Sequence, residues 1–448
     1  MTTDRHADLR RTVEEFARQE VAPRIAAMEH GQAVDAELAA LIAGQGWVGA
    51  TIAPSWGGMG AGHEAKTVII EELSRVSGAA GAIVQASQLG AAKIIHFGSP
   101  EQQRTWLPAI AAGDVLPTIA VTERVSGGHV LGMQSTARRT GSSWVLDGEK
   151  VFVGNSHVGH LHGVVVRTGK GPKDLTAFLV ESDRPGVSVL PHPSVLGLHG
   201  FSFGTVRLDR VKVPASAVVS DVGGGLAVAY SSSVLYGRPN LTAVALGLHR
   251  AVVERAVTEA TNRTRYGGHL GDLAVVQHKI GQMASRLAAA RALAYGAAAM
   301  LDRGQPCDGE LMAAKHQGIE LLLDSVRQAM EIHAAAGLDA AGEMARLMRD
   351  SWCINPPGRD RRHTGTPPGR ATPPPGTPPG LVATTGRRPA PAAGCGGPRR
   401  CGPDPHLLNR LMTTSPPGTW LRPHRPTSAV PNAVGDLAPD PPRCHPTA

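Results

Sequence analysis

The chain has 448 residues, of which 42% are hydrophobic, and its formal net charge is +8. This length predicts two to three domains, the hydrophobic content excludes a wholly disordered protein, and no run of 18 apolar residues is present to span a membrane. Residues 1–358 hold 33 basic and 33 acidic side chains. The excess positive charge therefore belongs to residues 359–448, and a nucleic-acid-binding core is not indicated.

The beginning of the chain carries charges throughout and lacks the apolar core of a signal peptide. We therefore expect a cytoplasmic protein. Residues 1–358 contain only two cysteines, Cys307 and Cys353, so no disulfide framework is predicted, as is usual in a reducing compartment.

Residues 1–112 are predicted to form an N-terminal helical domain. Apolar residues recur at helical spacing in Thr67–Val76, and Ala79–Phe97 is apolar on most sides, which indicates a buried helix. Pro100 is predicted to begin a further helix that ends at Gly113.

Residues 113–222 are predicted to form a middle β domain. Ser143–Val153 alternates around Asp147-Gly148, which predicts a hairpin with its turn at these two residues. About seven short strands without intervening helical patterns favour a compact antiparallel sheet or barrel.

Residues 223–358 return to helical periodicity and are predicted to form a C-terminal four-helix bundle. The expected helices are Ala227–Ala260, Leu273–Asp302, Asp308–Ala336 and Glu343–Arg349. The fold class is therefore an α+β multidomain protein, helical at both ends with a sheet between.

Residues 359–448 cannot supply a core, because they hold 21 of the 35 prolines and no Ile, Phe, Tyr, Lys or Glu. We predict a disordered tail. The absence of residues with AT-rich codons is typical of a GC-rich gene read out of frame, so a frameshifted C-terminus is the preferred interpretation. A natural Pro-rich linker is the alternative. Cys395, Cys401 and His406 have loose metal-ligand spacing, but a second Cys pair is missing, and no metal site is predicted.

Six motifs occur in one order along the chain. They are VIIEELSRV (Val68–Val76), AVTERVSGG (Ala120–Gly128), LDGEKVFVGN (Leu146–Asn155), NRTRYG (Asn262–Gly267), EIHAAAG (Glu331–Gly337) and RLMRD (Arg346–Asp350). Together they resemble the flavin-dependent acyl-CoA dehydrogenases, from about residue 5 to Gly358. The resemblance implies a helical domain, a β domain and a four-helix bundle, with FAD between the last two, in a homodimer or a tetramer of two dimers.

The resemblance also implies roles for individual residues in FAD binding. Val121, through its backbone, and Thr122 would meet the polar edge of the flavin, and Phe152 would form an aromatic wall. Arg263 of a neighbouring chain would hold the pyrophosphate, with Arg265 close by. Residues from Glu331 onward match the segment that contacts the adenosine half of the partner's FAD.

Several of these residues could instead have a purely structural or solvent-exposed role. Without the motif, Arg263 and Arg265 would be a solvated helix face, and Phe152 would be a core aromatic. Arg238 matches an Arg near the acyl thioester, but a structural salt bridge is an equal alternative. His157, His160 and His162 are expected to be exposed or core histidines and not metal ligands.

The chain departs from the family pattern around the cofactor. Gly127-Gly128-His129 stands where the family has Gly-Ser-Asp, so Gly128, on the substrate side, lacks a phosphate-facing hydroxyl. Gly154 replaces the hydroxyl that faces flavin N5, and a helix Gln falls on Ala274. Each loss removes about 0.5–1.5 kcal/mol of net hydrogen bonding, so FAD binding is weakened but not excluded.

The catalytic base is also missing. Dehydrogenation of an acyl thioester needs a carboxylate over the α-carbon, and the usual Glu position falls on Pro357, while the alternative position is Gly237. The catalytic residue is therefore unknown. The continuation Gly-Thr-x-Glu-Ile-x-Arg and the last helix are absent as well.

These observations predict an FAD-dependent oxidoreductase that acts on the acyl group of a thioester, on CoA or on an acyl carrier protein. The chain looks most similar to family members of polyketide gene clusters that oxidise glyceryl groups on a carrier protein, a chemistry that needs no base over an α-carbon. A short-chain acyl-CoA dehydrogenase with a displaced base and a non-catalytic truncated pseudoenzyme are the alternatives. The electron acceptor is not indicated, and neither nucleic acid nor a membrane is an expected partner.

Overall fold

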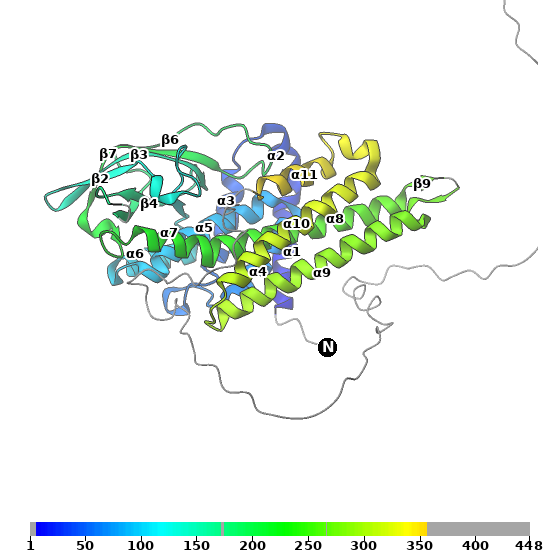
Figure 1. The fold of residues 1–448 in the computed structure, drawn as a ribbon, viewed down its shortest axis with the longest axis horizontal. Helices are drawn as coiled ribbons and strands as arrows, with labels where there is room; N and C mark the ends of the chain where they lie inside the picture. The colour runs from blue at the N-terminus through cyan, green and yellow to red at the C-terminus, as the bar shows by residue number, and fades with distance from the viewer. Residues whose placement is uncertain (1–5, 172–173, 266, 356–448) are drawn as a thin grey trace, which may run out of the picture. The chain divides into compact units, whose positions relative to one another are not determined.

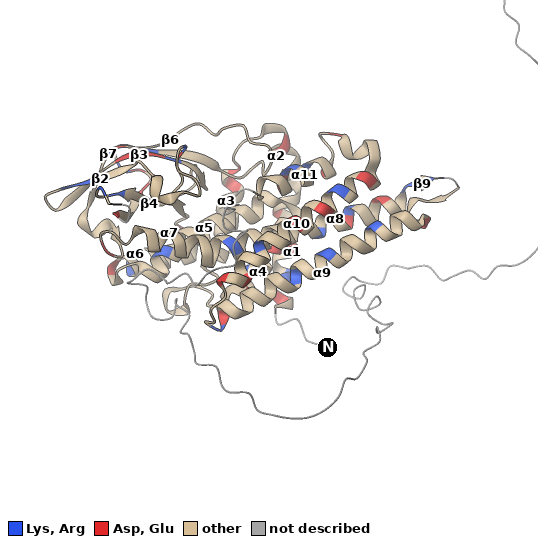
Figure 2. Ribbon diagram, viewed as in Figure 1, with Lys and Arg blue, Asp and Glu red and all other residues tan. Residues whose placement is uncertain are grey.

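The computed structural model describes residues 6–171, 174–265 and 267–355, and its elements follow the predicted order of helices, sheet and helices (Figure 1). The α+β class is thereby confirmed. The predictions for the tail and for Pro357 lie outside the described residues. Within those residues, no helix is long and apolar enough to cross a membrane. Acidic and basic residues occur together along the bundle helices and on the sheet (Figure 2), in keeping with the balanced charge of this part of the chain.

The first group of elements is helical. It comprises α1 (Ala7–Phe16), α2 (Ile25–Gly31), α3 (Ala36–Ala43), α4 (Gly62–Val76), α5 (Gly78–Phe97) and α6 (Pro100–Ala112). Helix α6 begins and ends as predicted, because Ser99 and Gln102 form a capping box, Pro100 takes the first helical position and Gly113 adopts φ 87°. Helix α4 begins five residues before the predicted start, where the Asp302 carboxylate accepts hydrogen bonds from the first backbone N–H groups, among them that of Glu64 at 2.9 Å.

The second group is a sheet in the order β6-β7-β3-β2-β4-β5-β8, with β1 paired to β4. Its strands are β1 (Pro117–Ala120), β2 (Thr136–Thr140), β3 (Ser143–Gly154), β4 (Leu161–Arg167), β5 (Leu175–Glu181), β6 (Val187–Val189), β7 (Phe203–Pro214) and β8 (Val218–Val219). Because β1 and β2 run parallel to β4, the sheet is mixed, and the expectation of a purely antiparallel sheet is wrong. Alternation along a strand reports which face is buried but not the direction of its neighbour.

The predicted hairpin turn at Asp147-Gly148 is also wrong. Strand β3 runs straight through these residues, and the turn lies at Gly141, with φ 60°, between β2 and β3. Gly148 instead forms a bulge with φ 142°, and a Cβ there would lie 2.2 Å from Ser135 Oγ. A glycine inside a strand pattern thus marks a close approach of another segment.

The third group is helical again. It comprises α7 (Gly225–Ser231), a π-helical turn (Ser232–Gly237), α8 (Arg238–Asn262), α9 (Ala274–Asp302), α10 (Asp308–His333) and α11 (Glu343–Cys353), with the short strands β9 (Thr264–Arg265) and β10 (Gly268–His269) between α8 and α9. Helices α8, α9 and α10 pack on one another, and α4 packs against α8 and α9. The predicted helix Ala227–Ala260 is therefore divided by the π-helical turn, a feature that often occurs at functional sites.

Candidate functional site

Helix α5 joins the end of the sheet to the beginning of α8. Asn155, directly after β3, donates its amide to the carbonyl oxygen of Ile83 at 2.8 Å, and Asn240 of α8 donates to that of Gln85 at 3.3 Å. Both amides are fully buried. One helix therefore positions two segments that are 85 residues apart in the chain.

Two glycines contact one face of this helix. A Cβ at Gly154 would lie 2.8 Å from Ala86 Cβ, and a Cβ at Gly237 would lie 3.5 Å from Leu89 Cδ2. Ala86 and Leu89 are three residues apart and so share one face of α5. Gly154, which replaces the N5-facing hydroxyl, and Gly237, at the alternative base position, thus border the same small region. The close contact with Ala86 leaves no room for a larger residue at position 154.

The segment after β1 presents polar backbone groups to this region. The carbonyl oxygen of Thr122 accepts a hydrogen bond from the N–H of Val151 at 2.8 Å, and that of Val121 accepts one from Lys150 Nζ at 3.2 Å. Among the described residues, the N–H of Thr122 donates to no acceptor. A half-buried backbone donor is therefore available to a ligand.

Phe152 lies next to this donor, one residue beyond Val151. Its side chain is 62% exposed, its φ is 56°, and its ring centroid lies 5.4 Å from that of Phe203. The alternative of a core aromatic is therefore excluded. A positive φ in a bulky residue is costly and concentrates at functional sites.

A buried ion pair shapes the loop that follows Thr122. Lys150 Nζ lies 2.6 Å from Glu123 Oε1, and the Glu123 carboxylate also accepts the N–H groups of Gln134 at 2.6 Å and Ser135 at 3.0 Å. Burial would raise the pKa of Glu123, but these donors hold it below its usual value. Burial likewise lowers the pKa of Lys150, against the opposing effect of Glu123. Sequence reasoning did not single out this pair, because two charges 27 residues apart carry no local signal. Gly128 is exposed on the same loop.

Arg238 is the first residue of α8 and follows Gly237. Its Nη1 atom is buried without a hydrogen-bond partner, its guanidinium group contacts the Tyr230 hydroxyl, and among the described residues the side chain forms no ion pair. The alternative of a structural salt bridge is therefore not supported.

The remaining predicted cofactor residues lie at the other end of α8. Arg263 Nη1 donates to Glu259 Oε1 at 3.0 Å and to the carbonyl oxygen of His333 at 3.2 Å, and exposed Glu331 pairs with Lys279 at 2.8 Å. Arg265 is exposed on β9, which Figure 1 shows beyond the end of the bundle that is remote from the sheet. At 1.5 Å per residue, the 25 residues of α8 extend over about 37 Å. The structure therefore brings the residues predicted to contact the flavin, Val121, Thr122, Phe152 and Gly154, together with the start of α8. It keeps Arg263 and Arg265 away from them.

The histidines make ordinary internal contacts. His157 hydrogen bonds with Ser202 at 2.8 Å, and His162 with Thr118 at 2.8 Å in the core. In the described part of the chain, no group of three or more His, Cys, Asp or Glu residues could hold a metal ion.

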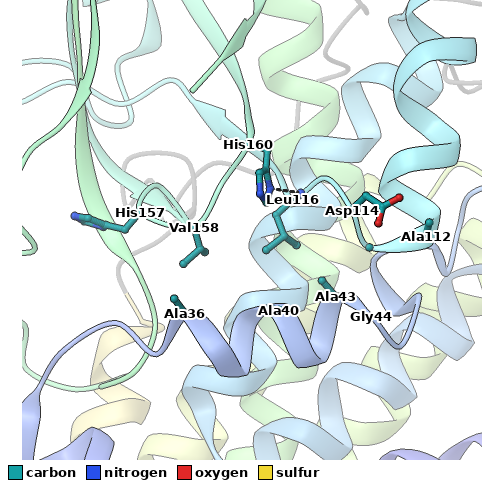
Figure 3. Close-up of a pocket in the computed structure, with 11 residues that line it drawn as sticks. Ala36, Ala40, Ala43, Gly44, Ala112, Asp114, Leu116, His157, Val158 and His160 are labelled. Carbon is teal, nitrogen blue, oxygen red and sulfur yellow. Dashed lines mark hydrogen bonds between the residues drawn. The ribbon is translucent and has the colours of Figure 1, made fainter. Parts of the chain in front are cut away.

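A cavity of about 360 Å³ lies between α3, the segment after α6 and the turn before β4 (Figure 3). Small side chains of α3 form one wall, and His160 accepts a hydrogen bond from the N–H of Leu116 at 3.1 Å on the other. None of the predicted site residues lines this cavity, so it is distinct from the candidate site.

Comparison with known families gives three consecutive matches. The N-terminal, middle and C-terminal domains of acyl-CoA dehydrogenases match residues 3–114, 118–211 and 223–356, respectively. The chain belongs to the acyl-CoA dehydrogenase family. An acyl-CoA dehydrogenase of Bacillus subtilis is 30% identical over 352 residues, which are 78% of this chain and 93% of that protein.

Solved structures share the acyl-CoA dehydrogenase fold. An acyl-CoA dehydrogenase complexed with FAD from Bacillus anthracis has a TM-score of 0.74 at 26% identity, covering 80% of this chain and 64% of that chain. The prolyl acyl carrier protein oxidase AnaB has a TM-score of 0.74 at 24% identity, covering 79% and 95%, which is a likeness of fold.

FAD is the cofactor of the acyl-CoA dehydrogenase family, and the residues present fit it. The exposed ring of Phe152 and the unpartnered N–H of Thr122 offer an apolar face and a polar edge side by side. At the far end of α8, Arg263 makes hydrogen bonds through Nη1, and its other guanidinium nitrogens have no partner among the described residues. The residues suited to the flavin and those suited to the phosphates therefore lie at separate places in one chain.

Proposed function

We propose that this chain is an FAD-dependent oxidoreductase that oxidises a hydroxyl-bearing acyl group held as a thioester, with a carrier protein as the bearer of the acyl group. The observation that carries the flavin site is the exposed Phe152 beside the unpartnered N–H of Thr122. FAD, when bound, supplies a hydride acceptor. The chain's own residues bind and orient the cofactor and the substrate.

In this proposal Val121 and Thr122 hold the polar edge of the flavin, and Phe152 covers one face of it. Gly154 lies at the N5 side without contributing a hydroxyl. Gly128 and Arg238 border the substrate, and the buried, unpartnered Nη1 of Arg238 supports a role for this guanidinium in binding a polar acyl group.

We further propose that the working unit is a homodimer. Arg263 and Arg265 follow the end of α8, and Glu331 lies near the end of α10. About 37 Å of helix separates the two arginines from Gly237 and Arg238 at the start of α8, so one chain alone would not hold both ends of the cofactor. If the same residues of a second chain meet the cofactor, they can hold its pyrophosphate and adenosine. In the isolated chain Glu259 and the His333 carbonyl keep Arg263 oriented until that contact forms.

The substrate class follows from the missing base. Removal of an α-proton from a saturated acyl thioester requires a positioned carboxylate, whose loss costs about 10²–10⁴-fold in rate. Gly237 cannot take a proton, and Pro357 cannot either. The proton of a hydroxyl group is far more acidic than an α-proton, so oxidation at a hydroxyl-bearing carbon tolerates the absence of this base. The fold shared with AnaB is compatible with a carrier-bound substrate and a place in secondary metabolism.

Flavin occupancy tests the cofactor site. Arg263→Ala is expected to lower the flavin content of the purified protein at least tenfold, because a phosphate contact is lost. The control is Arg138→Ala, which removes an exposed arginine of β2 that pairs with Asp147 at 3.7 Å. Equal flavin content in the two variants would refute the phosphate assignment.

Anaerobic bleaching of the flavin absorbance tests the substrate class. A glyceryl thioester on a carrier protein should bleach the flavin rapidly, and butyryl-CoA should do so slowly. Rapid bleaching by butyryl-CoA alone would instead indicate a short-chain acyl-CoA dehydrogenase with a displaced base. Bleaching by neither substrate, in protein that holds FAD, would indicate a pseudoenzyme.

A further inference from the structure

Lys150 is a buried cation with two strong contacts in the loop that we assign to the flavin edge. Its side chain is 0% exposed, and Nζ donates to Glu123 Oε1 at 2.6 Å and to the carbonyl oxygen of Val121 at 3.2 Å. Met133 Sδ lies 3.8 Å away. The ammonium group therefore has one ionic partner and one backbone partner, and it is shielded from water.

The backbone partner belongs to the same peptide group as the proposed flavin donor. The Val121 carbonyl and the Thr122 N–H are joined by one planar, resonance-stabilised amide. A cation at the carbonyl oxygen polarises this amide and strengthens the N–H as a donor, because hydrogen bonds in a chain polarise one another. That N–H has no acceptor among the described residues. The charge of Lys150 can thus reach a ligand through a single peptide group.

Glu123 fixes the direction of this effect. Its carboxylate is held by the N–H groups of Gln134 and Ser135, so its position beside Lys150 is fixed by the backbone. The ion pair is neutral as a whole, but its positive end lies at the Val121 carbonyl. A buried pair of this kind adds little net stability compared with apolar residues, and its value lies in geometry.

We propose that Lys150 is a positioning residue that raises the affinity for FAD and the reduction potential of the flavin through the Val121–Thr122 peptide group. This inference rests on the proposed flavin site. Reduction adds negative charge to the flavin, and a polarised N–H donor stabilises that charge more than it stabilises the oxidised ring. Loss of the lysine charge therefore weakens binding of the reduced flavin more than binding of the oxidised flavin.

The test compares FAD affinity and midpoint potential in three variants. Lys150→Met removes both the charge and the hydrogen bond, and Lys150→Gln removes the charge while keeping an N–H donor. Lys93→Met is the matched control, because Lys93 is also a fully buried lysine that donates to a backbone carbonyl, that of Thr118 in β1. FAD dissociation constants come from titration of the apoprotein, and potentials come from dye-coupled anaerobic reduction at pH 7.

Lys150→Met is expected to bind FAD about tenfold more weakly, the size of one hydrogen bond to a charged group. Both Lys150 variants should have a more negative potential, by about 30 mV for each tenfold difference between the two redox states. Lys93→Met should match the wild type in both measurements. If Lys150→Met does not fold, as judged by circular dichroism, Lys150→Gln decides.

Wild-type potentials in both Lys150 variants would overturn the inference, even if affinity falls, because a merely structural role would change affinity alone. An equal shift in Lys93→Met would overturn it as well. A wild-type protein that takes up no FAD would instead refute the proposed function from which the inference starts.

Discussion

Helices α4 and α5 both carry charged side chains into the interior, and they do so in opposite ways. Glu71 of α4 is fully buried, where it accepts a hydrogen bond from Tyr295 at 2.7 Å and pairs with Arg250 and Arg291. Lys93 of α5 is equally buried, but among the described residues its ammonium group donates only to the backbone carbonyl of Thr118.

The two regions differ in whether the buried charge is compensated. Around Glu71 and Glu72, cations from α1, α8 and α9 converge on α4, so the charges join four helices. Around Lys93 the neighbouring ionisable group is His162, which is itself a base. Burial lowers the pKa of Lys93 to about 7, and burial together with Lys93 lowers that of His162 to about 4. The first region should depend on its partners, and the second should depend on pH.

The largest change in the free energy of unfolding is expected at Glu71, where the buried charge is paired. Glu71→Ala removes the buried partner of Arg291 and Tyr295, while Arg250 keeps Glu72, and it should lower the free energy of unfolding by about 3 kcal/mol. Urea denaturation measures this change. Glu15→Ala, which removes the exposed partner of Arg18 on α1, should have no measurable effect. If the two variants are equally stable, the Glu71 network does not hold the helices together.

A smaller effect of opposite sign is expected at Lys93. The unfolded chain binds this proton with a pKa near 10.5 and the folded chain near 7, so the folded state is penalised increasingly as pH falls from 10.5 to 7, and fully below 7. Lys93→Met should therefore raise the free energy of unfolding at pH 7 by about 2 kcal/mol, and by less at pH 10. Lys212→Met, at an exposed position of β7, is the control. Destabilisation at both pH values would mean that the hydrogen bond to Thr118 outweighs the cost of the charge.

At neutral pH the smallest effect concerns His162, because its contribution appears only as the solution is acidified. Its folded-state pKa of about 4 lies below the unfolded value of 6.5, so stability should decline as pH falls from 6.5 to 4. The decline attributable to one such group is at most about 1.4 kcal/mol per pH unit. His162→Gln should flatten the curve of unfolding free energy against pH in this window. An unchanged slope would place the acid sensitivity elsewhere, for example at buried His249.

Local signals in the sequence were reliable where the cause of the structure is local. The start of α6 follows from Ser99, Pro100 and Gln102, because a capping box and an N-terminal proline act within one turn. The turn predicted at Asp147-Gly148 was wrong because the cause of the structure there is not local. A glycine with positive φ serves a turn or a bulge equally well, and only the approach of Ser135 decides that it is a bulge.

The candidate site likewise has features that the sequence motifs predict and features that only the tertiary structure shows. Motifs such as NRTRYG and AVTERVSGG determine the family and with it FAD, because each retains particular residues at particular spacings. They do not show that Phe152 is exposed, that Thr122 keeps a backbone donor unpartnered, or that Lys150 meets Glu123 in the core.

The sequence by itself therefore determined the order of helices and strands and the family, and it predicted the cofactor-binding residues that we propose. Only the tertiary structure decided which of those residues lie together: α5 joins Gly154 to Gly237, and the length of α8 separates both from Arg263. The physical reason is that helix periodicity, caps and motifs depend on neighbours within a few residues. Proximity across the fold depends instead on packing between segments that the chain order leaves tens of residues apart.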